Sequence, residues 1–380
     1  MAPVALAFGV LEVTGSATWL SAVLTASMVP LIATMIIGGG IADRYRRDLV
    51  LRLSSMGAGI SQAGVAIVLL THQDPVFLLP LAALNGIFQA LTTPTMRGIV
   101  PQLATGTGIQ VANSLLASAR NLARMIGPAA AGLLTVTIGG GWAIAADAAS
   151  FFLAGVCFGR ISLPGRAPRT AGSSTMRSEL REGWSYFSSQ PWIWSVTLAF
   201  AVLNAAYMGI WQILGPVIAV DTIGAEGWGL VLSARAAGSL LATMVMVKLT
   251  VRRPMVRALS LMTLAAVPLI LLGVGASAWW LAAAAFIAGV AAEFFTVVWS
   301  TVCHLHIPER LLSRVGAYDE FGSFASIPLG QLSVPFLAAA FGAATVAVTG
   351  GALLVAAMLS PLLLPSLRRL EMNTAAKRDT

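Results

Sequence analysis

Long apolar runs, separated by short polar connections, dominate this chain. An α-helix needs about 20 predominantly apolar residues to cross the roughly 30 Å hydrocarbon core of a bilayer. Runs of that size lie at 17–37, 50–70, 76–94, 112–138, 142–160, 192–219, 228–248, 255–275, 278–302, 314–341 and 344–364. The pattern predicts an all-α membrane protein with eleven complete spans.

The chain begins with a shorter apolar stretch, residues 1–11, about half as long as a span. We expect it to be the second half of a first helix that is truncated at its N-terminal half. A true eleven-helix protein with a short interfacial leader is the alternative. With the half helix counted, the largest polar gap divides twelve helices six and six. The predicted organisation is an N-terminal bundle at 1–160, a cytoplasmic linker at 161–191, a C-terminal bundle at 192–365 and a tail at 366–380.

Two parts make up the predicted linker. The segment from Pro164 to Thr175 is rich in Pro, Gly, Ser and Thr, which is typical of a flexible connection. The following segment places Leu180, Trp184 and Phe187 at i, i+4 and i+7 among charged residues. This spacing predicts an amphipathic helix that lies on the membrane surface.

Composition and charge exclude most other classes of protein. The chain is 57% hydrophobic and only 10% charged, too apolar to cover the exterior of a soluble domain. Its formal net charge is +8, but the basic residues gather in alternate connections between the apolar runs. That is the positive-inside pattern of a multi-pass membrane protein rather than a nucleic-acid surface. This pattern predicts a cytoplasmic C-terminus, and the excess of arginine, 21 of the 23 basic residues, favours a GC-rich bacterial source and so a bacterial inner-membrane protein.

No pattern for chemistry on a bound nucleotide, metal or cofactor emerges. The chain has no GxxxxGK[ST] sequence, and its two cysteines, Cys157 and Cys303, fall in or beside apolar runs. His304 and His306 lack the further ligands of a metal site. We therefore expect no enzyme activity, no cofactor and no metal. Any energy that the protein uses is expected to come from an ion gradient rather than from nucleotide hydrolysis.

A charged connection follows the second predicted helix, from Gly39 to Leu51, and a weaker basic copy occurs at Lys248 to Arg257. The first copy resembles the loop between helices 2 and 3 of the major facilitator superfamily, G-x-L-A-D-R-x-G-R-R-x-x-L. The resemblance implies a fold of two six-helix bundles and a cytoplasmic gate. Its residues are Asp43, Arg44 and Arg47, while Arg46 takes the usual glycine position.

A second match lies in the predicted fifth helix, at Gly127, Pro128 and Gly132. It resembles the G-P-x-x-G-G element of exporters in the superfamily, with Ala131 at the first of the paired glycines. Proline removes one backbone hydrogen bond and glycines permit close approach, so we expect a kinked hinge with tight helix packing. A general small-residue packing face is the alternative.

Further residues resemble one branch of the superfamily, the bacterial exporters that include enterobactin exporters and macrolide efflux pumps. They are Pro94, Arg97, Pro101, Asn113, Arg124, the stretch from Trp142 to Phe152, and Pro308-Glu309-Arg310 with Arg314-Val315. This resemblance implies export and leaves the substrate open.

Three charged residues lie deep in predicted helices, where ionised side chains are costly and often functional. The family resemblance implies that helices 1, 4, 7 and 10 line the cavity, which makes Glu293 the first candidate for proton or substrate binding. Arg235 is expected to contact an anionic substrate or to neutralise a carboxylate. Asp147 is expected to be structural. An internal hydrogen-bonded contact is the alternative for each of them.

Polar and aromatic residues in two further helices suit a cavity for an amphiphilic molecule or, equally, hydrogen bonds between helices. They are Asn85 and Gln89 in the fourth helix, and Asn204, Tyr207 and Trp211 in the seventh. Asp319 and Glu320 are expected to join Arg310 and Arg314 in the cytoplasmic gate.

These observations predict a monomeric, proton-coupled exporter of a small amphiphilic compound, which is drug-like, macrolide-like or siderophore-like. Its partners are the lipid bilayer, that substrate and protons. An importer or uniporter on the same scaffold is the first alternative. A membrane protein that does not transport, such as a sensor or a decayed paralogue, is the second.

Overall fold

The computed structural model describes residues 2–44, 46–103, 107–161, 176–246, 253–368 and 370. Almost all of these residues are helical, and none of them forms a strand. The predicted all-α fold is therefore confirmed. The chain divides into two compact units, Met1–Thr170 with Gly215–Ser233 and Ala171–Leu214 with Ala234–Thr380, each of which is described by itself.

The first unit is built on six helices that follow one another along the chain. They are α1 (Ala2–Thr14), α2 (Ala17–Arg44), α3 (Arg47–Leu70), α4 (Leu78–Leu103), α5 (Thr107–Ile138) and α6 (Gly140–Gly159), with a 3-10 turn at Pro75–Phe77. Helix α9 (Gly215–Thr222) and the first part of α10 (Gly224–Met246) pack in the same unit. Small and branched apolar side chains such as Ala5, Leu20, Val65 and Ile144 form its buried core.

The second unit holds the remaining helices. They are α7 (Met176–Ser189), α8 (Pro191–Gly209), the end of α10, α11 (Pro254–Met262), α12 (Ala266–Gly273), α13 (Ala278–His306), α14 (Glu309–Phe324), α15 (Ile327–Phe341), α16 (Ala343–Leu359) and α17 (Pro365–Arg368). Short π or 3-10 turns at Ile210–Leu214, Thr263–Ala265 and Ser360–Leu363 join consecutive helices.

Each of the eleven predicted spans coincides with a helix or with a pair of joined helices. Ten helical stretches of the described chain are long and apolar enough to cross a membrane. The predicted span at 112–138 lies within α5, whose described residues include the shorter apolar stretch Ile126–Ile138. Length and composition thus support a multi-pass membrane protein.

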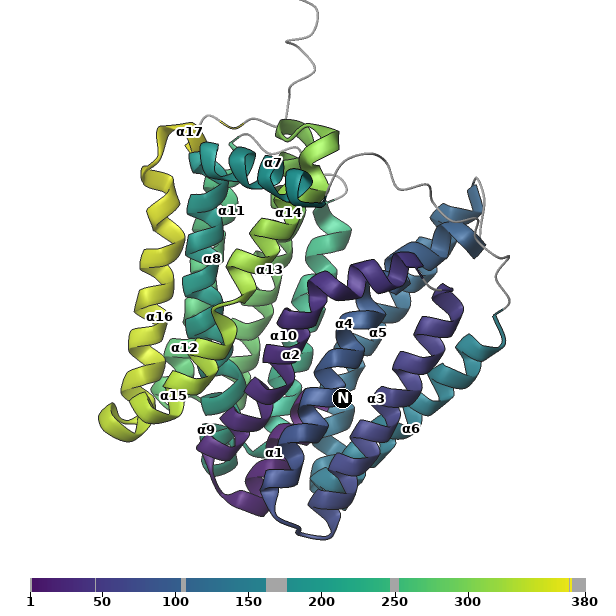
Figure 1. Ribbon diagram of the computed structural model, residues 1–380. Coiled ribbons are helices and arrows are strands. Elements are labelled where there is room, and N and C mark those ends of the chain that lie inside the picture. The colour runs from purple at the N-terminus through teal and green to yellow at the C-terminus, as the bar shows by residue number, and fades with distance from the viewer. Residues whose placement is uncertain are drawn as a thin grey trace, which may run out of the picture. The chain divides into compact units, whose positions relative to one another are not determined.

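The predicted amphipathic segment of the linker forms helix α7, which crosses the ends of α8 and α14 in Figure 1. The Tyr186 hydroxyl donates a hydrogen bond of 3.1 Å to the carbonyl of His306. The Trp184 ring packs on Tyr318 of α14, with ring centroids 5.4 Å apart. Helix α7 is therefore attached to the second unit by specific contacts.

Both units contain the same backbone features at a constant spacing of 203 residues. His72 and Gly275 have positive φ after α3 and α12, and Gly139 and Gly342 have positive φ just before α6 and α16. Gly86 and Gly289 each approach the backbone of a neighbouring helix so closely that an added Cβ would lie 2.0 Å from a carbonyl oxygen. This regularity supports an internal duplication.

Candidate functional site

The midpoints of two membrane-spanning helices bring polar and aromatic groups together inside the second unit. Arg235 lies at the middle of the 23-residue helix α10, and Tyr207 at the middle of the 32-residue span Pro191–Thr222. The guanidinium carbon of Arg235 lies 5.2 Å from the centre of the Tyr207 ring, a cation–π contact. The Trp211 ring stacks on Tyr207 at 5.5 Å. We call these three residues the mid-span cluster.

Polar atoms of the mid-span cluster that are buried without a hydrogen-bond partner include Nε of Arg235 and the hydroxyl of Tyr207, a residue that is only 2% exposed. Within the described chain, Arg235 makes no ion pair with an acid. A buried polar group normally has a partner, so the cluster is suited to a ligand that accepts hydrogen bonds.

Amide side chains close to the cluster in sequence already form hydrogen bonds between helices of the second unit. The Asn204 side chain donates a 2.9 Å hydrogen bond to the carbonyl of Ser323, and Gln331 donates one of the same length to Gln212. Asn204 thus makes the interhelical contact that was the alternative interpretation of its position. Tyr207 and Trp211 lie with Arg235 instead.

Among the residues whose side chains the structure describes, Asp319 of α14 contacts no arginine. Its Oδ1 accepts a 2.6 Å hydrogen bond from the hydroxyl of Thr197, and its Oδ2 accepts a 2.9 Å bond from the indole N–H of Trp299. Arg314, which was expected beside Asp319 in the gate, pairs with Glu182 of α7 at 2.7 Å, and the gate stays a prediction. The Arg310 side chain lies outside the part of the chain that the structure describes.

Glu293, the first candidate from the sequence, is half-buried near the middle of α13. It makes no hydrogen bond or ion pair with another residue in the described ranges. Four residues earlier, Gly289 packs against the backbone of Arg235. Glu293 therefore lies one helical turn from the contact between α13 and α10.

Candidate residues in the first unit are more scattered. Asn85 is buried in α4, and its Oδ1 has no hydrogen-bond partner, whereas Gln89 is exposed. Asp147 is half-buried in α6. Asn85 is adjacent to Gly86, which packs on the backbone of Ser27 in α2. These residues form no cluster comparable to the one around Tyr207.

The connection between α2 and α3 carries an ion pair that the motif did not predict. Arg46 donates to both carboxylate oxygens of Asp48, at 3.3 Å and 2.7 Å. This hydrogen bond, and then the charge of Asp48, raise the pKa of Arg46 above its ordinary value. Asp43 and Arg44 end α2, but their side chains lie outside the described residues, and Arg47 is half-buried at the start of α3.

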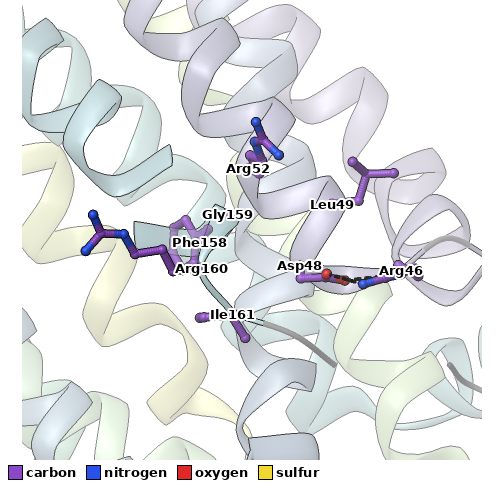
Figure 2. Close-up of a pocket in the computed structure, with 8 residues that line it drawn as sticks. All are labelled: Arg46, Asp48, Leu49, Arg52, Phe158, Gly159, Arg160 and Ile161. Carbon is purple, nitrogen blue, oxygen red and sulfur yellow. Dashed lines mark hydrogen bonds and ion pairs between the residues drawn. The ribbon is translucent and has the colours of Figure 1, made fainter. Parts of the chain in front are cut away.

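This ion pair lines a pocket of about 350 Å³ between the start of α3 and the end of α6, shown in Figure 2. Arg52 and Arg160 line the same pocket. Gly159 leaves space for the Arg52 side chain, because a Cβ there would lie 3.3 Å from its Cδ and Nε. The pocket is thus basic and lies at one end of the helices.

The proline motif lies within one continuous helix, since α5 runs from Thr107 to Ile138 through Pro128. Its glycine approaches α10 closely, because a Cβ on Gly132 would lie 2.7 Å from the carbonyl of Ala225. The hydroxyl of Ser233 accepts a 3.0 Å hydrogen bond from the N–H of Ala129. The motif therefore makes a tight contact between α5 and α10 in the first unit.

No group of three or more His, Cys, Asp or Glu side chains suited to a metal ion occurs in the described ranges. The rings of His304 and His306 approach the carbonyls of Ser300 and Val302, one turn earlier in α13. These histidines thus bond within their own helix.

A multi-pass helical membrane protein with polar groups at the middle of its spans is the architecture of a transporter. A model of the Major Facilitator Superfamily matches residues 1–318. The chain belongs to this superfamily, and it is a transporter rather than an enzyme.

Curated relatives are bacterial exporters. The chain is 27% identical to the multidrug efflux pump Tap of Mycolicibacterium fortuitum, over 88% of this chain and 84% of Tap. It is 26% identical to the enterobactin exporter EntS of Citrobacter koseri, over 54% of this chain and 49%, or about half, of that relative. The resemblance to the bacterial exporter branch is therefore confirmed.

Solved structures share the fold. A variant of the nucleoside transporter NupG has a TM-score of 0.78 at 12% identity, over 95% of this chain and 94% of its own. A POT family transporter in complex with 5-aminolevulinic acid has a TM-score of 0.69 at 13% identity, over 91% and 87%. At these identities the likeness shows the major facilitator fold alone.

Proposed function

We propose that this protein exports a small amphiphilic organic compound in exchange for protons, by alternating access. Support for export comes from the relatives named as an efflux pump and an exporter. The proposal includes a monomer in a bacterial inner membrane with a cytoplasmic C-terminus, as the distribution of basic residues favours. The substrate is drug-like, macrolide-like or siderophore-like in character.

The mid-span cluster is the observation that carries the proposal. A guanidinium inside a bilayer is costly unless it has a partner, and Arg235 has no acidic partner in the described chain. Transporters of this type bind their substrates near the middle of the membrane. A substrate oxyanion would accept hydrogen bonds from Arg235 and Tyr207, while its apolar body would contact the ring of Trp211.

Other residues take supporting roles in this proposal. Asp43, Arg44 and Arg47 form the cytoplasmic gate, and Gly127, Pro128 and Gly132 form the hinge of α5. Asn85 and Gln89 contribute polar surface, Asn204 holds α8 to α14, and Glu293 is a further candidate for coupling. The tight contact of Gly132 with α10 supports a role for the motif in helix movement.

A matched pair of compounds tests this function in inverted membrane vesicles with an acidic interior. Naphthalene-2-sulfonate stays anionic at all relevant pH values, so a pH gradient cannot distribute it passively. Naphthalene-2-sulfonamide has the same ring without the charge. We expect gradient-driven accumulation of the sulfonate above the sulfonamide, abolished by a protonophore. Equal accumulation in vesicles without the protein contradicts the proposal.

A further inference from the structure

Asp319 is a carboxylate without a counter-ion in the part of the second unit that the structure describes. It lies in the membrane span Arg314–Phe341, and its nearest arginine along the helix is occupied by Glu182. An anion in such a place is costly when no cation compensates it. Binding a proton removes that cost, so the surroundings suit a group that changes its charge.

Three helices meet at this carboxylate. Thr197 lies six residues from the start of α8, and Trp299 lies seven residues from the end of α13. Both positions are about 10 Å from those helix ends, at about 1.5 Å per residue. The Trp299 ring is held by Trp192 at 5.7 Å and by Phe295 at 6.0 Å. The geometry of the site is therefore fixed by packing.

The two donors differ in what they can do. The indole N–H of Trp299 can only donate, so Oδ2 of Asp319 must accept in every state. The Thr197 hydroxyl can donate or accept. It lies 2.6 Å from Oδ1 of Asp319 and also 3.1 Å from the carbonyl of Ile193. Its hydrogen thus has a second acceptor already in place.

We propose that Asp319 binds the coupling proton on Oδ1 and that Thr197 is its positioning residue, an inference that rests on the proton-coupled function proposed above. Without the proton, the Thr197 hydroxyl donates to Oδ1. When a proton arrives, the new O–H of Asp319 donates to Thr197, whose own hydrogen turns to the carbonyl of Ile193. One proton binds to Oδ1 and later leaves it, and no other covalent bond is made or broken.

Protonation reaches the mid-span cluster through shared helices. Helix α8 carries Thr197 and, ten residues later, Tyr207, about 15 Å along the axis. Helix α13 carries Trp299 and also Gly289, which packs on the backbone of Arg235. When Asp319 becomes neutral, its bond to Trp299 loses charge assistance and about half its strength. Protonation of Asp319 therefore weakens the hydrogen bond to α13 and reverses the hydrogen bond to α8.

Other ionisable groups near Asp319 are few. The Cys303 thiol of α13 interacts electrostatically with it. On the neighbouring elements, Arg314 pairs with Glu182, and Tyr186 donates to the carbonyl of His306. The rings of His304 and His306 bond within α13. The other ionisable groups there are half-buried: Glu320, Tyr318 and Glu293. No described group supplies a cation to Asp319.

A transport experiment in proteoliposomes tests the assignment with naphthalene-2-sulfonate. We expect Asp319→Asn to lose gradient-driven accumulation more than tenfold and to keep sulfonate exchange at equal pH. Thr197→Ser keeps both activities, whereas Thr197→Val loses accumulation. Asp221→Asn makes the same change at an exposed position and serves as the control. Full accumulation by Asp319→Asn, or its loss only in Glu293→Gln, overturns the assignment.

A spectroscopic experiment separates this inference from the proposed function. Infrared difference spectra of the wild-type protein between neutral and acidic pH should contain the C=O band of a protonated carboxylic acid. The component of that band that belongs to Asp319 should shift in Thr197→Val and be missing from Asp319→Asn, while the components of the other carboxyl groups stay. A band that is identical in Asp319→Asn and the wild type overturns the inference, even if wild-type transport is driven by protons. A wild-type protein without gradient-driven transport refutes the proposed function instead.

Discussion

Two aspartates, Asp48 and Asp319, show how different surroundings give one side chain different uses. Asp48 is buried at the start of α3 and receives both hydrogen bonds from one arginine, Arg46. Asp319 lies inside a span and receives its bonds from a hydroxyl and an indole. An ion pair favours the charged form of a carboxylate, whereas neutral donors leave protonation open. The first arrangement suits a fixed structural contact, and the second suits proton binding.

The largest expected effect comes from giving Asp319 the kind of partner that Asp48 has. In Thr197→Lys, an ammonium replaces the hydroxyl beside Oδ1 and stabilises the carboxylate. We expect gradient-driven accumulation of naphthalene-2-sulfonate to fall more than tenfold, because the proton no longer binds. Size-exclusion chromatography confirms folding, and Thr197→Ser is the control. Wild-type accumulation by a folded Thr197→Lys protein would remove the distinction between the two aspartates.

A smaller effect should follow from moving Thr197 without changing it. A Cβ on Gly322 would lie 2.7 Å from the Cγ2 of Thr197, so Gly322→Ala displaces the hydroxyl from Asp319. We expect a several-fold loss of gradient-driven accumulation. Gly316→Ala in the same helix meets no atom within 4 Å and should change nothing. Equal behaviour of the two variants would show that the position of Thr197 is unimportant.

Removal of the second donor should move the pH dependence. Trp299→Phe takes away a charge-assisted hydrogen bond, about 1.5–3 kcal/mol, that favours the charged form of Asp319. The neutral form of Asp319 keeps about half of that bond, so the variant favours the protonated form by only about half of this energy, and the pH profile of sulfonate accumulation should move upward by about half to one pH unit. A profile that is unchanged, or that moves to lower pH, would contradict the assigned role of Trp299.

The smallest effect is expected from changing Asp48, whose partner is Arg46. Arg46 is exposed for 57% of its side chain, and ion pairs of this kind contribute about 1 kcal/mol or less to stability. Asp48→Asn should therefore lower the midpoint of thermal unfolding slightly, less so at high salt, and leave the pH profile of transport unchanged. A changed pH profile would make Asp48 a second proton site.

The fold could be predicted from the sequence because its main cause is local. An apolar run of about 20 residues has one stable form in a bilayer, a helix, so the spans and even the helix α7 followed from the pattern of residues. The gate motif and the proline motif identified the superfamily through a few residues such as Asp43 and Pro128. The ion pair of Arg46 with Asp48 was not predicted, because Asp48 stands where the motif has an arginine.

The site was predictable only in part, since it depends on contacts between distant helices. The depth of Arg235 and the shared face of Tyr207 and Trp211 were visible in the sequence, but their meeting was not. Asp319 was assigned to arginines nearby in sequence, whereas its partners lie 122 and 20 residues away. No periodicity indicates that Thr197 and Trp299 converge on one carboxylate.

The most direct test of the account is the movement of protons caused by the substrate itself. A pH-sensitive dye is enclosed in proteoliposomes at equal pH on both sides, and naphthalene-2-sulfonate is added outside. The account predicts that sulfonate entry drives protons out, so that the lumen becomes alkaline, and that the signal is absent with Asp319→Asn. Sulfonate entry without a change in lumenal pH, or an undiminished change with Asp319→Asn, would contradict it.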